Sequence, residues 1–372
     1  MNLSYWEYQS WLSNIDYTIV GSGIVGLNAA LRLKEKYPTA RVLVLERGFL
    51  PNGASTKNAG FACFGSLSEI LYDLESHSEE MVVNLVRKRI NGLELLRKTI
   101  GDSTMDYHIW GGYEFFPEKE KESQEKCISQ MADVNKLLHP VFNDEVFTTC
   151  KNTFNFKNIR EPLIYNKFEG QINTGKMMEA LLLKVQMAGV KILNNIMVEE
   201  ISDLNDSVVI KTDKFEFKTK KLLIASNGFA SKFGIPEVKP ARAQVLVTKP
   251  IKDLRIKGTF HLDKGFYYFR NIDDRILFGG GRNLDLKGEE TTDMTQTSLI
   301  QNKLEELLKT TILPDTPFEI ENRWSGIMGV GETKEPIIKH LSSNTVCGVR
   351  LGGMGVAIGS LTGREMADLA TN

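Results

Sequence analysis

The sequence has few cysteines, almost no net charge and no long apolar run, and each of these properties argues against one class of protein. Its four cysteines in 372 residues show no Cys-x-x-Cys spacing and no nearby histidine cluster, which argues against a disulfide framework and a structural zinc site. Lysine and arginine number 46 against 47 aspartates and glutamates, so the net charge of −1 lacks the basic excess typical of nucleic-acid binding. No run approaches the roughly 18 apolar residues that a membrane span needs.

The start of the chain also lacks a basic segment followed by an apolar one, so we expect no secretory signal peptide. We therefore expect a cytoplasmic protein with free thiols, no metal site, no nucleic-acid partner and no integral membrane association. Residues 1–15 carry several aromatic side chains, which predict a short helix packed on the body. At roughly 100–200 residues per domain, the length favours about two domains.

A glycine-rich turn between an expected strand and an expected helix is the most informative feature that is present. Residues 17–20 are a β-branched apolar run, Gly-Ser-Gly-Ile-Val-Gly follows at 21–26, and a helical pattern then runs to about residue 37. The next strand, over residues 41–45, is followed by Glu46, 20 positions after the last glycine of the turn. This spacing is typical of a βαβ unit that binds a dinucleotide.

Each residue type in this unit has a physical reason. Gly21 permits the tight turn, Gly23 lets the backbone approach a pyrophosphate, and Gly26 lets the helix pack closely on the strand. The N-terminus of the helix offers free N–H groups to phosphates. Glu46 would accept hydrogen bonds from an adenosine ribose. The motif alone does not separate NAD from FAD.

Two further segments favour a flavin. Residues 51–61 form a glycine- and hydroxyl-rich loop soon after Glu46, where it could wrap the ribityl chain and phosphates. Residues 348–363 contain six glycines, and we expect a loop there that approaches a planar cofactor and precedes a helix starting near Leu361. Elsewhere, the pattern predicts helices over 79–96 and 293–308 and a hairpin turn at Asp273-Asp274.

These segments together resemble the D-amino-acid-oxidase superfamily of FAD-dependent oxidoreductases, which includes glycine, sarcosine and γ-glutamylputrescine oxidases. The most specific matches are residues 16–46, Gly53-Ala54-Ser55-x-x-Asn58-x-Gly60 and Gly352-Gly353-x-Gly355. Weaker matches lie at 169–176, 189–199, 222–228, 240–244 and 323–326, so the resemblance covers nearly the whole chain in order. It implies that the cofactor is contacted by Gly21, Ser22, Gly23, Ile24, Val25, Gly26, Glu46, Arg47, Ala54, Ser55, Lys57, Asn58, Ala59, Gly60, Val198, Ser226, Asn227, Gly228, Gly352, Gly353, Met354, Gly355, Val356 and Ala357.

The departures from the family pattern concern the substrate and the mode of flavin attachment. Amino-acid oxidases of this family often carry an arginine for the substrate carboxylate shortly after a Trp-x-Gly segment. Here Gly326 is followed by Ile327, Met328 and Gly329, so that arginine is absent. Sarcosine oxidases attach the flavin through a cysteine in the same region, and a methionine cannot do so. We therefore expect non-covalent FAD.

Five residues are candidates for work on the substrate. Arg350 could clamp a carboxylate or form a structural salt bridge, and Lys57 could assist at the flavin or bind phosphate. Tyr267 and Tyr268 lie on an expected strand that walls the substrate site in the family, and strand alternation lets only one of them face the flavin. His261 could be a base, although a lone histidine near a strand is more often a satisfied structural residue.

The resemblance implies a two-domain α/β protein. A discontinuous Rossmann-type FAD-binding domain would comprise residues 1–70, 165–240 and 323–372, and an α+β antiparallel-sheet substrate domain would comprise 71–164 and 241–322. The implied reaction oxidises a C–N bond of an amino acid or other amine by hydride transfer to flavin N5, followed by imine hydrolysis. The small-molecule substrate and the oligomeric state stay open, and the electron acceptor could be oxygen or a carrier.

Two other functions stay open. A hydroxy acid or polyol could be oxidised at a C–OH bond, because the arginine expected for an amino-acid carboxylate is missing. An FAD-binding partner protein with little turnover is a further alternative.

Overall fold

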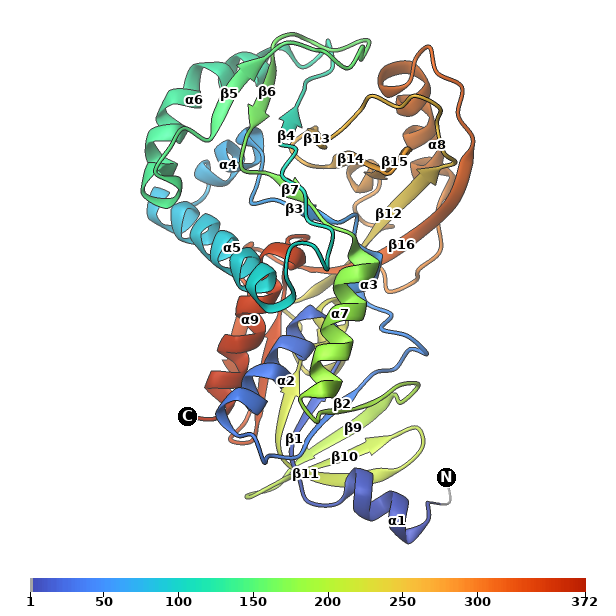
Figure 1. Ribbon diagram of the computed structural model, residues 1–372. Coiled ribbons are helices and arrows are strands. Elements are labelled where there is room, and N and C mark those ends of the chain that lie inside the picture. The colour runs from blue at the N-terminus through green and yellow to red at the C-terminus, as the bar shows by residue number, and fades with distance from the viewer. Residues whose placement is uncertain (1–2) are drawn as a thin grey trace.

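A computed structural model describes residues 3–372 of the chain, so the first two residues of the expected N-terminal helix and domain lie outside the described part. Within it, the chain builds two eight-stranded sheets and a small two-stranded one. In Figure 1 one large sheet occupies the lower half of the molecule, beside both termini, and the other occupies the upper half. The chain passes between the halves several times, because strands distant in sequence share each sheet.

The lower sheet has a parallel centre, which the apolar runs around the glycine turn explain. Its order is β17-β18-β11-β1-β2-β8, and β1 (Ile15–Val20) pairs in parallel with β2 (Val42–Leu45) and with β11 (Glu216–Ile224). All four residues of β2 are buried, as expected for a strand covered on both faces. The other strands here are β8 (Lys191–Leu193), β9 (Val198–Asp203), β10 (Val208–Thr212), β17 (Ile337–His340) and β18 (Thr345–Val349).

Three helices pack together over one face of this sheet (Figure 1): α2 (Ile24–Lys36), α7 (Thr174–Met187) and α9 (Gly355–Ala370). Their apolar side chains share one core cluster with β1, β2, β11 and β18. A second cluster lies on the opposite face and includes Leu12, from the short N-terminal helix α1 (Tyr5–Glu7) and its π-helical continuation Tyr8–Leu12. The lower half therefore has the layered architecture of a nucleotide-binding α/β unit.

The upper sheet is mostly antiparallel and runs β16-β12-β15-β14-β13-β4-β6-β5. One of its faces is packed with aromatic rings; Phe260 and Phe269 stack 4.5 Å apart between their centroids. Its strands are β4 (Gly112–Glu114), β5 (Phe147–Cys150), β6 (Leu163–Asn166), β12 (Lys239–Thr248), β13 (Thr259–Leu262), β14 (Tyr267–Ile272), β15 (Arg275–Gly280) and β16 (Ile320–Val330). The remaining α-helices and β-strands are α3 (Ala54–Lys57), α4 (Leu67–Leu74), α5 (Glu79–Ile100), α6 (Lys121–Phe142), α8 (Ser298–Leu307), β3 (Phe61–Ala62) and β7 (Gly170–Gln171).

Two expected helix starts are wrong. Helix α8 begins at Ser298 instead of residue 293, because the Asp293 carboxylate accepts bonds from the backbone and hydroxyl of Thr295 and holds a turn there. Helix α9 begins at Gly355, six residues before Leu361. Its glycines at 359 and 363 are helical and lie against α2, so part of the glycine-rich stretch serves helix packing.

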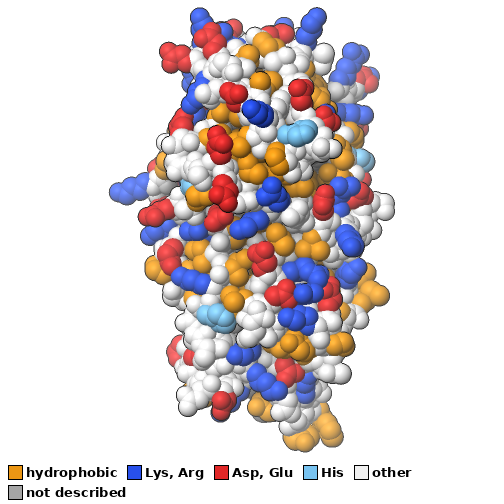
Figure 2. All heavy atoms as spheres, turned by 90° about the vertical axis from the view of Figure 1, so that its left-hand side faces the viewer, with side chains coloured by type: hydrophobic (Ala, Val, Ile, Leu, Met, Phe, Trp, Pro, Cys, Tyr) orange, Lys and Arg blue, Asp and Glu red, His pale blue; other side chains and the backbone are white. Residues whose placement is uncertain are grey.

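The mixed α/β class with a Rossmann-type parallel sheet and an antiparallel second sheet is confirmed. The expected boundaries at residues 165 and 323 fall inside β6 and β16 of the upper sheet. In residues 3–372 we find no helix with the length and apolarity to cross a membrane. Figure 2 shows acidic and basic side chains intermixed over the face that carries α5 and α9, in keeping with the nearly zero net charge.

Candidate active site

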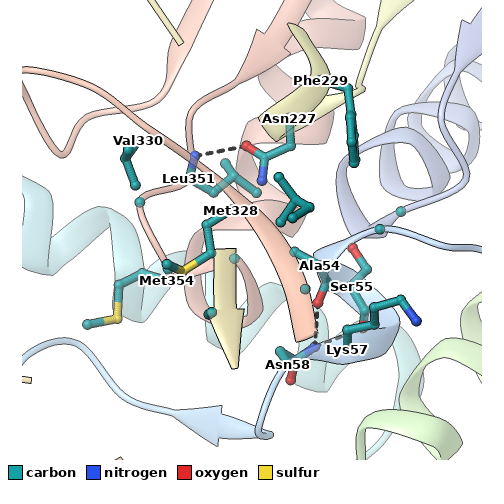
Figure 3. A pocket seen from close by; sticks show the side chains of 18 of the residues that line it. Ala54, Ser55, Lys57, Asn58, Asn227, Phe229, Met328, Val330, Leu351 and Met354 are labelled. Carbon is teal, nitrogen blue, oxygen red and sulfur yellow. Dashed lines mark hydrogen bonds between the residues drawn. The ribbon is translucent and has the colours of Figure 1, made fainter. Parts of the chain in front are cut away.

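A cavity of about 1180 Å³ lies where the two large sheets meet. It exceeds the roughly 300–1,000 Å³ typical of small-ligand pockets. Its walls come from the strand ends of the lower sheet, the loop and helix at 52–59, the segment 351–356, and one face of the upper sheet. Figure 3 shows several of these segments grouped around one space.

The glycine turn after β1 is built by close backbone approach. A Cβ atom on Gly26 would lie 2.0 Å from the Gly21 carbonyl oxygen, and Gly21 itself has a φ of +108°. The Ser55 hydroxyl accepts a hydrogen bond from the Ile24 backbone N–H at 3.0 Å, and a Cβ on Gly23 would lie 2.8 Å from that hydroxyl oxygen. The first turn of α2 therefore presents backbone to the cavity, which suits phosphate binding.

Glu46 is buried beside this turn and lines the cavity. Its carboxylate accepts hydrogen bonds from the Ser22 hydroxyl at 2.8 Å, the Ser22 backbone N–H at 3.2 Å and the Gly48 backbone N–H at 2.9 Å. Two of these bonds end on Oε2 and one on Oε1, so Oε1 keeps capacity to accept another. A fixed anion at this position suits the hydroxyl groups of a ribose.

The same end of the cavity has an aromatic and basic rim. The Arg47 guanidinium lies 3.7 Å from the centroid of the Phe229 ring, within the range of a cation–π contact. Val198, at the start of β9, also lines this end, where the family resemblance places a backbone contact to the cofactor. These groups could enclose a nucleotide base and its sugar.

The glycine-rich segment after β18 forms a second close approach to the cavity. Gly352 and Gly353 have φ values of +56° and +84°, which an L side chain rarely adopts. The Asn227 side-chain oxygen accepts bonds from the backbone N–H groups of Arg350 and Leu351, at 3.1 and 3.2 Å. Helix α9 starts directly after this turn and directs its N-terminus to the cavity, which favours negative charge there.

The loop that carries Lys57 is fixed by its neighbours. The Trp324 indole N–H donates to the Lys57 carbonyl oxygen at 3.0 Å, and the Asn58 amide donates to the Ser55 carbonyl at 2.8 Å. The Asn58 side-chain oxygen in turn accepts from the Gly60 N–H at 2.8 Å. Lys57 itself lines the cavity.

The upper sheet supplies the facing wall, and only one of the two adjacent tyrosines belongs to it. Tyr267 is buried among the rings of the aromatic core, whereas Tyr268 lines the cavity. The Tyr268 ring packs against Gly279, where a Cβ would lie 2.7 Å from a ring carbon, and makes an edge contact with Phe61 at 5.5 Å. Burial raises the pKa of Tyr268 to about 12, so its hydroxyl stays protonated at neutral pH.

His261 also reaches the cavity wall, but its ring is already engaged. Its Nε2 lies 2.5 Å from a Glu169 carboxylate oxygen, and both side chains are buried. Burial lowers the pKa of His261, but the charge and hydrogen bond of Glu169 outweigh it and raise the pKa to about 9. The imidazole is therefore protonated at neutral pH and is poorly suited to act as a general base.

Arg350 does not line the cavity. Its guanidinium donates to the Glu335 carbonyl oxygen at 2.9 Å and to the Thr333 hydroxyl at 2.7 Å, in the loop between β16 and β17.

Of the residues expected at the cofactor, most line the cavity. The exceptions are Ser22, Gly26, Gly60, Gly228 and Ala357, which support the lining segments from behind.

Sequence reasoning missed several cavity residues of the substrate side. Glu69 and Asp73 come from α4, whereas Arg282 and Asn283 come from the 3₁₀ turn directly after β15. Their only signal in the sequence is position: Arg282 follows three consecutive glycines, at the point where a strand ends. A strand end beside glycine is a common place for functional side chains, but the pattern alone does not tell which way they point.

The chemistry of the cavity fits FAD. Backbone is presented at two glycine turns, a fixed carboxylate lies beside the first turn, and the aromatic side chains of Phe61 and Tyr268 line the same cavity. A dinucleotide with a planar ring needs each of these: amide donors for phosphate, an acceptor for ribose, and room for close backbone approach to the ring.

Comparisons with known proteins agree with this geometry. Residues 16–369 match the family model DAO, described as FAD dependent oxidoreductase. The gamma-glutamylputrescine oxidoreductase of Escherichia coli (strain K12) is 23% identical over 377 aligned residues, which cover 95% of this chain and 83% of that protein.

Solved structures of similar fold include two named for amino acids. Glycine oxidase from Geobacillus kaustophilus aligns with a TM-score of 0.76 at 19% identity, covering 96% of this chain and 95% of that one. L-proline dehydrogenase from P. horikoshii aligns with a TM-score of 0.73 at 19% identity, covering 96% and 93%. These likenesses show the fold.

Proposed function

This chain belongs to the DAO family of FAD-dependent oxidoreductases, and we propose that it oxidises a C–N bond of an amino acid or other amine. In the proposed reaction the carbon next to nitrogen would give up a hydride and the nitrogen a proton, and water would hydrolyse the resulting imine to a carbonyl compound and ammonia, or an amine where the nitrogen carries a second substituent. FAD, when bound, supplies the two-electron acceptor. The observation that carries the proposal is the single cavity that both glycine turns and the Tyr268 wall share.

The residues of the chain have separate tasks in this proposal. The turn at 21–26 and Glu46 bind the adenosine diphosphate part, and the turn at 352–355 positions the ring. Tyr268 and Phe61 exclude water from the facing side with their rings. Because Tyr268 stays protonated and His261 is ion-paired with Glu169, neither side chain accepts the proton of the amine in this proposal.

We also propose that the FAD is held without a covalent bond. Met328 lines the cavity at the position where a cysteine would be needed. Cys347 is buried in the core of the lower sheet, and Cys63 is the cysteine that lines the cavity. Burial raises the pKa of the Cys63 thiol well above its ordinary value, which keeps it as an unreactive thiol.

The names of the relatives favour an amine over an alcohol. The curated relative is named for γ-glutamylputrescine, and the two structures described above are named for glycine and L-proline. Each is an amine or an amino acid. We further propose a cytoplasmic location, which the four free cysteines favour.

The test begins with the visible absorbance of the purified protein before and after heat denaturation. We expect a yellow protein that releases its flavin into the supernatant. Amines, amino acids, hydroxy acids and polyols are then added one at a time without oxygen, and we expect an amine to bleach the flavin. Bleaching only by an alcohol would support hydroxy-acid or polyol oxidation instead, and no bleaching by any compound would support a binding protein with little turnover. Readmission of oxygen, with and without an artificial carrier, identifies the electron acceptor.

A further inference from the structure

We infer that Arg282 binds a carboxylate of the substrate, so that this enzyme acts on amines that also carry a carboxylate. The inference rests on the proposed amine oxidation and names the substrate class of that same site. The family arginine for a substrate carboxylate would lie at residues 327–329, and this chain has none there. Arg350 is not a substitute, because its guanidinium is hydrogen-bonded outside the cavity. The inference therefore assigns the carboxylate to a different residue.

Arg282 brings a positive charge into the substrate half of the cavity. It begins the 3₁₀ turn Arg282–Leu284, is half-buried, and lines the same wall as Tyr268. Its guanidinium lies 5.7 Å from the Phe266 ring centroid, and within residues 3–372 no hydrogen bond or ion pair of that guanidinium is found. The Glu289 carboxylate attracts this guanidinium without bonding to it and is itself ion-paired with Arg242. A carboxylate from a ligand would therefore still offset the cost of this partly desolvated cation.

Arg282 also differs from the other cations around the cavity. Lys264 lies over the Tyr72 ring at 5.1 Å, and Lys334 forms an ion pair with Asp73 at 2.6 Å. Arg47 and Lys57 belong to the nucleotide and flavin loops. Among these five, Arg282 lies on the upper-sheet wall and, within residues 3–372, has no ion pair and no ring centroid closer than 5.7 Å. Lys232 also lines the cavity, but it is exposed and belongs to the 3₁₀ segment Asn227–Phe233, which carries Phe229 at the nucleotide end.

The next residue adds an acceptor to this cation. Asn283 donates its side-chain amide to the Asp263 carboxylate at 2.8 Å, whereas its own side-chain oxygen is buried without a hydrogen-bond partner. Buried acceptors normally find a donor. Within residues 3–372, the turn therefore holds a half-buried cation next to a buried acceptor that has no donor, and a bound ligand could supply the missing partners.

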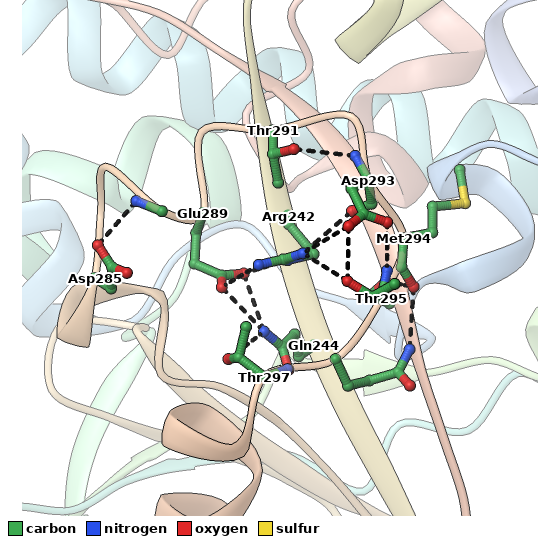
Figure 4. A network of polar contacts seen from close by, with 12 residues as sticks. Arg242, Gln244, Asp285, Glu289, Thr291, Asp293, Met294, Thr295 and Thr297 are labelled. Atoms are coloured by element: carbon green, nitrogen blue, oxygen red, sulfur yellow. Dashed lines mark hydrogen bonds and ion pairs between the residues drawn. The ribbon is translucent and has the colours of Figure 1, made fainter.

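The turn is held rigidly on both sides. Before it, Gly280 has a φ of +120° and a Cβ there would lie 2.0 Å from the Phe266 carbonyl oxygen, which fixes the path of the chain. After it, Glu289 forms a buried pair with Arg242 of β12 at 2.7 Å and accepts the Gln244 amide at 3.0 Å (Figure 4). A pre-organised binding group loses little entropy when its ligand arrives.

The experiment measures binding without turnover. The FAD-loaded protein is titrated with acetate, butanoate and hexanoate and with their uncharged amides, and the shift of the visible flavin spectrum reports binding. We compare the natural protein with Arg282→Gln and Arg282→Lys, and we use Lys264→Gln as the matched loss of a cation from the same cavity. Within residues 3–372 the Arg282 side chain forms no hydrogen bond or ion pair, so we expect its variants to fold, and an FAD content equal to that of the natural protein would show this.

We expect at least one carboxylate to bind the natural protein about 10–100-fold more tightly than its amide, the value of one charge-assisted hydrogen bond or more. Arg282→Gln should abolish that preference and change amide binding by less than about threefold. Arg282→Lys should keep part of it, since the charge remains but the planar fork is lost. Lys264→Gln should leave it intact.

Equal binding of carboxylates and amides by the natural protein would overturn the inference. So would a preference that survives in Arg282→Gln, or one that Lys264→Gln removes equally. The chain length that binds most tightly indicates how far the substrate carboxylate lies from the oxidised carbon. Tightest binding of acetate would indicate a carboxylate next to that carbon, and tightest binding of hexanoate would indicate a distant one. Either result supports a carboxylate site at Arg282. If no amine bleaches the flavin, the proposed amine oxidation fails while this binding result stands by itself.

Discussion

At the scale of single residues, the nucleotide end of the cavity depends on the buried carboxylate of Glu46. Its carboxylate is buried, bonded to Ser22 and Gly48, and open to the cavity. We expect Glu46→Ala to raise the Kd for FAD by about 10–100-fold, which corresponds to the loss of one or more hydrogen bonds to a charged group. The measurement is flavin fluorescence during titration of the apoprotein.

The matched control is Glu200→Ala. Glu200 also borders the cavity, but its carboxylate is exposed and pairs with Lys211 at 2.7 Å. An exposed pair of this kind contributes little, so the Kd for FAD should change by less than about threefold. Equal losses in both variants would contradict a specific contact between the Glu46 carboxylate and the nucleotide.

The buried pair between His261 and Glu169 makes stability depend on pH. Because the pKa of His261 is about 9 in the folded protein, against 6.5 for an ordinary histidine, the folded state keeps a proton that the unfolded state releases. The contribution of the pair is complete below about pH 6.5 and is lost as the pH rises through about 9. We expect the Tm of the natural protein to fall across this window, and the fall to be smaller in His261→Gln.

Thermal unfolding at a series of pH values from about 6 to 9.5 checks this prediction. His340→Gln is the matched control, because His340 is exposed and should leave the pH profile unchanged. Parallel profiles for the natural protein and His261→Gln would show that His261 is not the group responsible.

At the scale of elements, the packing of α9 on α2 depends on glycine. A Cβ on Gly363 would lie 2.3 Å from the Val25 carbonyl oxygen, which is backbone and has little freedom to move. We expect Gly363→Ala to destabilise the protein by about 1–3 kcal/mol through overpacking, and to lower the Tm by a few degrees. Because α2 carries the phosphate-binding turn, FAD affinity should fall as well.

Gly175→Ala is the matched substitution. Gly175 lies in the first turn of α7, and a Cβ there would meet only the Asn173 side-chain oxygen, at 3.3 Å. Alanine has the higher helix propensity, so the Tm should stay level or rise slightly. Similar losses in the two variants would contradict the assigned role of close helix packing.

Local patterns predicted the elements that have strong periodicity and turn chemistry. The first strand, the glycine turn, the helix over 24–36 and the Asp273-Asp274 hairpin turn were all visible in the sequence. The glycine-rich stretch at 348–363 was harder, because a glycine needed for a turn and one needed for helix packing look the same. Which use applies depends on contacts with α2, which is more than 300 residues away in the sequence.

The cavity wall depends even more on distant contacts. Strand alternation predicts that one of Tyr267 and Tyr268 faces the flavin, but the choice depends on which sheet face carries the aromatic core. Arg350 and Arg282 differ in the same way. Both follow apolar strands beside glycines, and the loop at 331–335 determines that the first is bonded outside the cavity.

At the scale of the whole molecule, the cavity belongs to both sheets. Arg270 of the upper sheet donates to the Ala59 carbonyl oxygen at 2.5 Å and to the Ile172 carbonyl oxygen at 2.9 Å. Ala59 lies in the loop that lines the cavity, so the upper sheet holds part of the cofactor site in place. Binding of the complete cofactor should therefore stabilise both halves of the protein.

The last prediction compares two ligands, FAD and ADP, to distinguish the responses of the two halves of the protein. FAD should raise the Tm of the apoprotein, with a stabilisation of about 2.7 kcal/mol at a concentration 100 times the Kd. In hydrogen exchange, FAD should slow residues 16–46 and 259–282, which line the cavity from the lower and the upper sheet respectively. ADP carries the nucleotide part without the ring, so it should slow only 16–46. Equal protection of 259–282 by ADP would mean that this wall responds to closure of the two halves and not to contact with the ring.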